Sequence, residues 1–509
     1  MPPSISEECL KRPLDAPILP PLIHIREKRC PSVSLEESPS TETIGNVFYN
    51  KDSFSRPSTS TTAPPTVLSI PPKRQHPIIR NLRHAYLGVY QRLFTIVFIA
   101  NIVALVLLFL KVDPSSVQML SNLSTASAAN ITVAVLMRQP YMINFIFKSC
   151  WIIPKSAPLR LRRILAKIYE FGGVHSSAAI SSTVWFMVFT ALLMKNMLEG
   201  RMHDIAVLIV AWILVLLLTV IVIFALPAFR KVLHNTFEIT HRFGGWTALL
   251  LLWAELVLFA HSINANRPQG AEPRALVLIL VQEPSFWFLA ITSSFVIWPW
   301  LLLRKLHIQP EYLSDRSIRL HFTGYKVPPF SGISISRSPL FEWHPFACMA
   351  THDGGSVLIS NAGDWTNDTI RNPGSHYWVR GIPVTGVLNM SQIFKKVVIV
   401  TTGSGIGPVL SYLIGVKKKG ICRLIWSAPD PMCNFGKEIC DTVKNIDSEA
   451  NIINTTRSGR PDLVTLAYQQ YIEFGAEAVF VLSNPRLTRE IVYALESRGV
   501  PAFGPVLDS

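Results

Sequence analysis

The sequence is poor in the features that mark small secreted proteins or metal-binding proteins. It has seven cysteines in 509 residues, and no two of them stand in a Cys-x-x-Cys spacing. A disulfide framework and a structural zinc site are therefore not expected. No long apolar run precedes Leu93, which is too late for a cleaved signal peptide, so we expect the first apolar run to be retained as an anchor.

Charged residues are also scarce, at 16%, whereas hydrophobic residues make up 49% of the chain. This balance is typical of membrane proteins. The net charge of +15 could indicate a nucleic-acid partner. However, the basic residues flank the apolar segments instead of gathering in one soluble domain, which is the pattern of a membrane-topology signal. We therefore expect a lipid bilayer as partner and no nucleic acid.

Six apolar stretches of about 18 to 24 residues are each long enough to cross roughly 30 Å of hydrocarbon. They lie at 93–110, 130–153, 174–194, 205–226, 243–262 and 285–303. The second is unusual because it contains Arg138, Pro140 and Asn144. Residues 1–75 are rich in proline, serine and threonine without an apolar period, so a disordered cytosolic tail is expected there.

Lysine and arginine are unevenly divided between the two sets of connections, with fifteen on one side and five on the other. Since cytosolic connections are enriched in these residues, both termini are expected in the cytosol of a multi-pass membrane protein. Plasma membrane and endomembrane stay open. The glycosylation sequons at Asn122 and Asn130 fall on the expected first external loop, which predicts a glycoprotein.

After Lys305 the composition changes to that of a soluble α/β protein. Residues 317 to about 390 alternate short β-rich runs with glycine and proline turns, which predicts a small antiparallel β-barrel. From Lys395 strand-like and helix-like runs alternate, which predicts a doubly wound parallel sheet. The expected domains are a tail at 1–75, a six-span bundle at 76–305, a β-barrel at 306–392 and an α/β domain at 393–509.

A glycine-rich turn follows the first strand-like run of the α/β domain and opens a helix. Its residues are Gly403, Ser404, Gly405, Ile406 and Gly407. Glycines let the backbone approach a pyrophosphate, and a helix N-terminus supplies amide donors. The alternative is a turn that only packs tightly. Arg457 and Arg460 follow a later strand and could meet a ribose 2′-phosphate, although a solvated loop is the commoner explanation.

The run His344-Pro345-Phe346-Ala347 stands between strand-like segments. Because proline removes its own donor and fixes φ, neighbouring amides can be held toward one ligand edge while Phe346 offers an apolar face. The run is thus a candidate flavin platform. An edge strand that carries a proline is the competing interpretation.

The chain has an apolar bundle, then a barrel, then a doubly wound half. Over about residues 80–509, this domain order resembles that of the ferric reductases and NADPH oxidases. His344-Pro345-Phe346 is similar to their flavin motif, with Ala347 in place of its hydroxyl residue. A segment similar to their Ile-Arg-x-x-Gly-x-Trp-Thr motif contains Asp364, Trp365 and Thr366, with Ser360 in place of the arginine. The resemblance implies FAD and NAD(P)H bound by these residues, the glycine turn and the two arginines.

The same resemblance implies a haem site in the bundle. Family members carry two histidines 13 or 14 residues apart on the third and fifth spans and bind two haems. Here His175 begins the third span and His241 the fifth, which leaves ligands for one inner haem b at most. The alternative is a pair of histidines in a cytosolic vestibule. Arg138 and Glu255 are expected to pair at the level of the missing outer haem; the alternative is that Arg138 extends to the external lipid headgroups.

Other departures concern hydride transfer. Ser483-Asn484-Pro485 stands where the family has Cys-Gly-Pro, and no aromatic residue ends the chain. Segments 171–179 and 240–246 and the C-terminal run are similar to a fungal TmpA-like group of integral membrane flavoproteins. We expect a membrane flavoprotein that passes electrons from NAD(P)H through FAD to an unknown acceptor at the cytosolic face or in the membrane. The alternative is a catalytically degenerate relative in signalling, development or specialised metabolism.

Overall fold

The computed structural model describes residues 70–266, 274–416 and 420–505. Most of the expected tail, residues 1–69, lies outside the described residues. In the N-terminal half the helices are α1 (Pro77–Asn81), η1 (Leu82–Tyr86), α2 (Val89–Lys111), α3 (Val117–Leu136), α4 (Pro140–Trp151), α5 (Leu159–Leu165), η2 (Ala166–Glu170), α6 (Gly172–Leu198), α7 (Ile205–Ala225), α8 (Pro227–Val232), α9 (His234–Ala265), α10 (Leu276–Gln282) and α11 (Pro284–Leu301).

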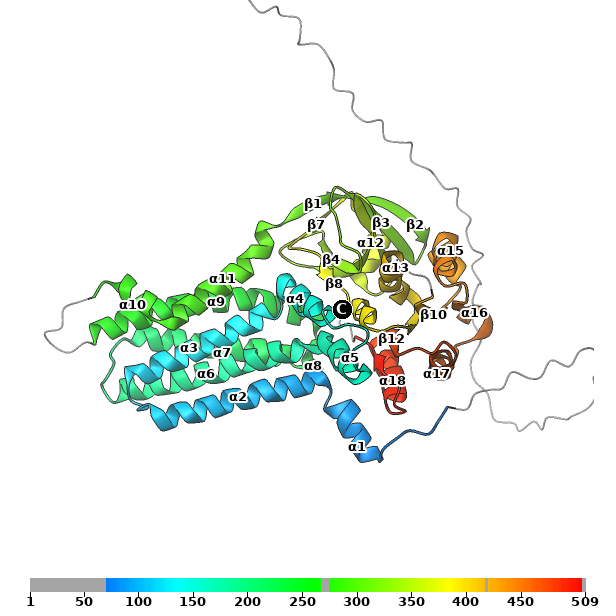
Figure 1. Cartoon of the computed structure of the whole chain (residues 1–509). Coiled ribbons are helices and arrows are strands. Elements are labelled where there is room, and N and C mark those ends of the chain that lie inside the picture. The colour runs from blue at the N-terminus through cyan, green and yellow to red at the C-terminus, as the bar shows by residue number, and fades with distance from the viewer. Residues whose placement is uncertain (1–69, 267–273, 417–419, 506–509) are drawn as a thin grey trace, which may run out of the picture. The chain divides into compact units, whose positions relative to one another are not determined.

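Six of these helices, α2, α3, α6, α7, α9 and α11, are long and apolar enough to cross a membrane (Figure 1). Their inward faces share a core that includes Phe186, Phe189 and Phe259. Their outward faces also carry large apolar side chains: α2 has no buried residue, and Leu216 and Leu250 are 67% and 71% exposed. Apolar surface on both sides of a helix is what a lipid environment allows.

The second span differs from its expected position. It runs over Val117–Leu136, and the apolar run that follows forms the separate helix α4. The break falls at Gln139, whose extended backbone precedes Pro140, because proline disfavours a helical residue before it and suits the first position of the next helix.

This shift corrects the expected glycosylation sites. Asn122 and Asn130 both lie inside α3 and not on a loop. The Asn130 amide donates to Asn101 of α2 at 2.8 Å, so this side chain joins two helices within the bundle.

The expected pair of Arg138 and Glu255 is also wrong. Because α3 ends at Leu136, Arg138 lies at the same end of the bundle as His175 and His241, within electrostatic range of both. Glu255 lies toward the other end, near Asp204, and neither of its carboxylate oxygens has a hydrogen-bond partner in the described structure. The expected depth of Arg138 assumed that the second span covers 130–153. Because the span ends at Leu136, Arg138 lies beyond its C-terminal end.

The segment after α11 forms an antiparallel sheet. Its strands are β1 (Arg304–His307), β2 (Gln309–Ser314), β3 (Ser317–Thr323), β4 (Ser331–Ser336), β5 (His344–Ala350), β6 (Gly354–Ser360), β7 (His376–Val379) and β8 (Val384–Thr385), with α12 (Asp364–Arg371) after β6. The strand order is β1-β7-β4-β5-β6-β3-β2, and β8 pairs with β4. Only Ile308 separates β1 from β2 although they lie at opposite ends of this order, so the sheet must curl toward a barrel.

A second sheet follows η3 (Val387–Ile393). Its elements are β9 (Val397–Thr402), η4 (Gly403–Gly405), α13 (Ile406–Gly415), β10 (Cys422–Ala428), α14 (Pro431–Phe435), α15 (Lys437–Ile446), β11 (Asn451–Asn454), α16 (Thr455–Ser458), α17 (Leu463–Glu473), β12 (Ala478–Leu482), α18 (Pro485–Glu496) and β13 (Ala502–Phe503). All pairs are parallel in the order β11-β10-β9-β12-β13. The expected doubly wound sheet is confirmed.

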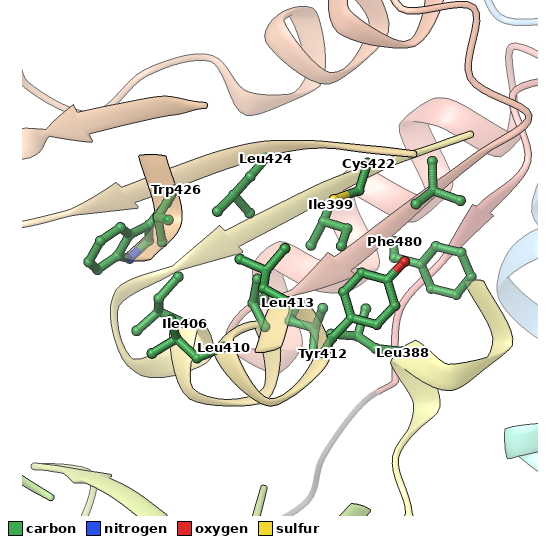
Figure 2. Packing of buried hydrophobic residues seen from close by; sticks show 14 of the residues in the cluster. Leu388, Ile399, Ile406, Leu410, Tyr412, Leu413, Cys422, Leu424, Trp426 and Phe480 are labelled. Atoms are coloured by element: carbon green, nitrogen blue, oxygen red, sulfur yellow. The ribbon is translucent and has the colours of Figure 1, made fainter. Parts of the chain in front are cut away.

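The two faces of this sheet have separate cores, because side chains alternate along each strand. One face packs Ile399, Leu424 and Phe480 against α13 and α15 (Figure 2). The other packs Val398 and Val479 against α17 and α18. Buried runs on both faces explain why these strands read as continuously apolar in the sequence.

Candidate functional site

The glycine turn lies at the carboxyl end of the central strand β9. Gly403 has φ +50°, a conformation that side chains disfavour. Gly405 has no room for a side chain: a Cβ there would lie 2.5 Å from both the Leu482 carbonyl oxygen and Thr401 Oγ1. The turn is therefore pressed against β12, and α13 begins directly after it. This is the arrangement in which a helix N-terminus can receive a phosphate.

Two residues of the turn have structural roles. The Ile406 side chain is fully buried in the core, and its N–H closes the turn on Gly403, so it offers a cofactor no direct contact. Gly407 is buried against Leu358 of β6, and a Cβ at this position would lie 3.7 Å away in ordinary van der Waals contact, so packing alone does not require a glycine here. Ser404 remains exposed at the tip of the turn.

The strand order reverses between β9 and β12, and open α/β sheets bind ligands at such a point. Here Thr402 and Ser483 hydrogen-bond across the gap, while Thr401 donates to the Leu482 carbonyl at 2.9 Å. Ser483 therefore stands beside the glycine turn at the place where the resemblance leads one to expect a cysteine.

Arg457 and Arg460 lie just beyond β11, on the same edge of the sheet as the glycine turn, because all these strands are parallel. Both are exposed. The end of β11 is fixed by Asn454 and Asp430, which exchange two hydrogen bonds of 3.1 Å. The end of β11 is thus fixed by hydrogen bonds, and the two arginines after it are exposed to solvent, where an anionic group can reach them.

The His-Pro-Phe run occupies the first three positions of β5 and is covered by a tryptophan that comes from α12. Trp365 stacks on His344 with ring centroids 4.0 Å apart and lies 6.0 Å from Phe346. Pro345 is exposed, and the half-buried Ala347 has no hydroxyl to offer. The three rings form one aromatic surface, which could support a flat conjugated ligand.

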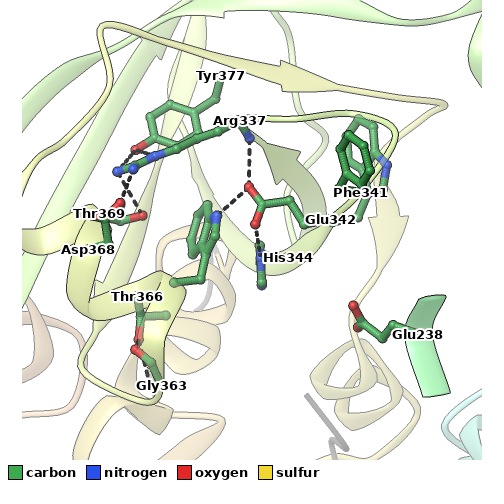
Figure 3. A network of polar contacts seen from close by, with 12 residues as sticks. Glu238, Arg337, Phe341, Glu342, His344, Gly363, Thr366, Asp368, Thr369 and Tyr377 are labelled. Atoms are coloured by element: carbon green, nitrogen blue, oxygen red, sulfur yellow. Dashed lines mark hydrogen bonds and ion pairs between the residues drawn. The ribbon is translucent and has the colours of Figure 1, made fainter. Parts of the chain in front are cut away.

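Glu342 ties this surface together and was missed from the sequence. Its carboxylate accepts a hydrogen bond from Trp365 Nε1 at 2.7 Å and lies 3.5 Å from His344 Nε2 (Figure 3). Burial lowers the pKa of His344, and the opposing effect of Glu342 is smaller. A carboxylate inside the aromatic run Phe-Glu-Trp-His was the signal that could have identified it.

Arg337 holds the other end of this network. It contacts Asp368 and Tyr377 and donates to the Asn372 carbonyl at 2.6 Å, so α12 is fixed against β4 and β7 (Figure 3). With its donors engaged, Arg337 does not replace the arginine that is missing at Ser360.

The segment before α12 forms a tight turn. The backbone N–H groups of Ala362 and Gly363 both donate to Thr366 Oγ1 at 2.9 Å, while Asp364 is exposed. Thr366 therefore shapes the turn from within. Its hydroxyl donates to the Gly363 carbonyl, so the hydroxyl and the N–H groups of Ala362 and Gly363 are all engaged within the turn.

Helix α13 of the doubly wound domain packs against strand β5 of the antiparallel sheet. Ser411 of α13 donates to the carbonyl oxygen of Cys348 in β5 at 2.6 Å. Burial raises the pKa of the Cys348 thiol to about 12, so this cysteine is no candidate nucleophile. The helix that opens at the glycine turn therefore rests on the strand that carries His344.

In the bundle, His175 of α6 and His241 of α9 face each other with ring centroids 6.3 Å apart. The Nδ1 of His175 lies 2.8 Å from the Ala134 carbonyl oxygen. An Nδ1–H bonded in this way leaves the Nε2 lone pair for a metal, which is the usual orientation of a ligating histidine. The two imidazoles are therefore close enough to be candidate ligands of one metal ion.

The aromatic surface is attached to the bundle next to this pair. Arg242 contacts the Phe341 carbonyl, and Phe243 and Phe341 have ring centroids 6.2 Å apart. Arg242 and Phe243 follow His241 directly in α9. Phe341 precedes His344 by three positions. Two sites that lie about 100 residues apart in the sequence are thus brought together. No cluster of three or more His, Cys, Asp or Glu residues that could hold a metal ion occurs among residues 70–266, 274–416 and 420–505.

Fold and site define a class: an apolar helical bundle joined to a curled antiparallel sheet and a doubly wound sheet with a glycine turn at its switch point. Residues 387–509 match the family described as the C-terminal domain of adenylate-forming reductase 03009. Adenylate-forming reductases 03009 and 06235 of Coprinopsis cinerea are 40% and 39% identical over 86% of this chain. The chain spans only 42% of the length of each relative.

Solved structures with partial similarity include a flavohemoglobin from Malassezia yamatoensis with bound FAD and heme. It is 12% identical, has a TM-score of 0.37, and the match covers 75% of this chain and 98% of that one. A ferredoxin-NADP+ reductase from Plasmodium falciparum has 12% identity and a TM-score of 0.31, with 40% and 94% covered. No functional conclusion rests on resemblance at this level.

Proposed function

We propose that this protein is a membrane oxidoreductase that takes electrons from NAD(P)H through FAD, and through one haem held by His175 and His241, to an acceptor at the cytosolic face or in the bilayer. The observation that carries the proposal is the attachment of the His344 surface to α9 beside His241. If bound by these residues, FAD would supply the conversion of a hydride into single electrons, and a haem would supply one-electron transfer.

The chain's own residues divide the work of binding. The glycine turn and the first turn of α13 face the pyrophosphate of the nicotinamide nucleotide, and Arg457 with Arg460 meets its ribose end. Phe346, His344 and Trp365 support the flavin ring, and Glu342 keeps the Trp365 indole oriented. His175 and His241 hold the haem iron, with the Ala134 carbonyl fixing the His175 tautomer.

Membrane placement is part of the same proposal. The six apolar helices support it, and so do the basic residues of the α3–α6 connection, which lies at the His175 end of the bundle. This end would face the cytosol, where NAD(P)H is available. With no second histidine pair on α6 and α9, we propose an acceptor on this side or within the bilayer, such as a quinone.

An absorption spectrum of the full-length protein in detergent tests the proposal. We expect flavin bands and a Soret band, both changing when NADPH is added without oxygen. His175→Ala should remove the Soret band and leave the flavin bands, whereas His261→Ala, a histidine 20 residues beyond His241, should change neither. Absence of both chromophores would contradict the proposal and favour the degenerate, non-catalytic alternative.

The relatives' names favour a second candidate acceptor. An adenylate-forming reductase is named for activating a substrate and reducing it, and the similarity covers 86% of this chain. The acceptor would then be an activated acyl group that another domain or protein delivers at the cytosolic face. Aldehyde formation from an added acyl adenylate, dependent on NADPH, would distinguish this candidate from quinone reduction.

A further inference from the structure

A cavity of about 460 Å³ lies where the curled sheet meets the end of the last apolar helix, and none of the candidate cofactor residues lines it. Its polar lining comes from Tyr141, Arg304, Tyr325, Lys326 and Asp353, and the backbone of 381–383 completes the wall. These residues come from α4, the start of β1 and three turns of the antiparallel sheet. The fold therefore gathers them from distant parts of the chain.

The cavity is separate from the proposed flavin site. His344 begins β5, whereas Asp353 lies in the turn after β5 ends at Ala350. Seven residues of extended strand span roughly 20 Å. The two sites thus lie at opposite ends of the same strand.

The charges that line the cavity have no ion-pair partner among the described residues. The Arg304 guanidinium lies 5.9 Å from the centroid of the Tyr325 ring, a contact that orients it without neutralising it. The Asp353 carbonyl accepts a hydrogen bond from Gly324 N at 2.8 Å, which holds this turn beside Tyr325 and Lys326. Two exposed cations and one exposed carboxylate therefore line one opening.

The cavity lies at the cytosolic end of the proposed bundle. Arg304 follows the end of α11 by three residues, and Trp298 of α11 lies 3.3 Å from the Tyr141 hydroxyl. Tryptophan and tyrosine are enriched at the level of lipid headgroups. Leu301 and Phe145 nearby are 70% and 64% exposed, so apolar surface leads from the bilayer region toward the opening.

We propose that this cavity binds the headgroup of a phospholipid that carries a primary amine, drawn from the cytosolic leaflet. Arg304 and Lys326 receive the phosphate through charge-assisted hydrogen bonds, and Asp353 receives the ammonium group. The acyl chains lie along Leu301 and Trp298. The inference rests on the proposed membrane placement but not on flavin or haem binding. The bound lipid would join the curled sheet to the bundle.

The test uses full-length protein, delipidated in detergent and incubated with dioleoyl phosphatidylethanolamine, phosphatidylcholine or phosphatidylglycerol, with retained lipid measured by native mass spectrometry. Wild-type protein should retain phosphatidylethanolamine over phosphatidylcholine by roughly fivefold, the equivalent of one exposed ion pair. The double variant Arg304→Gln, Lys326→Gln should lose this specific retention. Asp353→Asn should bind both lipids equally.

Lys305→Gln is the matched control. Lys305 neighbours Arg304 but places its ammonium 5.9 Å from the centroid of the Trp378 ring, outside the cavity lining. It should retain lipid as the wild type does. An unchanged midpoint of thermal unfolding in the double variant would show that it is folded whether or not flavin or haem is bound, which separates this inference from the proposed function.

Two results would overturn the inference. Equal retention of all three lipids by wild type and double variant would show lipid around the bundle without a site. Displacement of the lipid by millimolar inorganic phosphate, dependent on Arg304 and Lys326, would show that the cavity takes a soluble phosphate.

Discussion

Arg162 of α5 places both terminal guanidinium nitrogens on the carboxylate of Glu477, at 2.7 and 3.0 Å. It also donates to the carbonyl oxygens of Ala157 and Ile393 and is only 3% exposed. The connection between α3 and α6 is thus joined to the doubly wound sheet by a bidentate ion pair between a buried arginine and a half-buried glutamate. The pair secures the C-terminal sheet to the helical bundle.

Removing this arginine should destabilise the protein. Arg162→Ala leaves the half-buried Glu477 carboxylate and the Ile393 carbonyl without their partner, and losing a hydrogen bond to a charged group costs roughly 1.5–3 kcal/mol. Thermal unfolding in detergent should show a lower midpoint for the doubly wound domain. Arg160→Ala removes an exposed charge from the same helix and is the control. Equal midpoints for the two variants would contradict this account of the contact.

The same pair predicts how stability depends on pH. Burial by itself would raise the pKa of Glu477, but hydrogen bonds from Arg162 and the Lys395 amide outweigh it and lower the pKa below the usual value. A carboxylate with a lowered pKa in the folded state stabilises the protein above its unfolded pKa, and this stability is lost as the pH falls through the folded pKa. Unfolding curves measured below about pH 4.5 should show a loss that Glu477→Gln reduces. An equal loss of stability at acid pH in wild type and Glu477→Gln would contradict this role of Glu477.

The close approach at Gly405 predicts a second effect. A methyl group there would lie 2.5 Å from the Leu482 carbonyl, so Gly405→Ala should push the turn away from β12 and weaken NADPH binding at least tenfold. Gly245→Ala is the matched control, since its position in α9 has nothing within 4 Å, and alanine favours a helix by roughly 0.5–1 kcal/mol. Quenching of intrinsic fluorescence by NADPH measures binding. Unchanged affinity in Gly405→Ala would remove the turn from the candidate site.

The sequence predicted the elements whose signal is local and missed the features that depend on where elements end. Buried strand runs with glycine turns predicted the doubly wound sheet, and apolar length predicted six helices. The second helix differs from its expected position for two reasons. Ser121, Ser127 and Asn130 make α3 polar enough to resemble a loop in the sequence. The side chains of α4 are apolar because they pack into the core of the soluble half, and in the sequence this apolar run resembles a membrane span. That one shift carried Arg138 to the wrong end and created the false pair with Glu255.

The network around Glu342 could not be predicted for a different reason. Its partner Trp365 comes from α12, 23 residues later in the chain, and the stack forms because the antiparallel pairing of β5 and β6 returns the chain to the start of β5. Contacts of this kind follow from register and curvature, which a single sequence does not display.

The exposed arginines beyond β11 give the final prediction, which concerns the choice of nucleotide. If Arg457 and Arg460 meet the ribose 2′-phosphate, the double variant Arg457→Gln, Arg460→Gln should raise the KM for NADPH about tenfold or more, because a hydrogen bond to a charged group is worth roughly 1.5–3 kcal/mol. The KM for NADH should not change, since NADH lacks that phosphate. Arg489→Gln, which removes an exposed charge from α18, controls for the general loss of positive charge.

The difference in KM between NADPH and NADH should also depend on salt, because exposed charges are screened at high ionic strength. An equal rise for both nucleotides would mean that the arginines shape the strand end and do not select the phosphate.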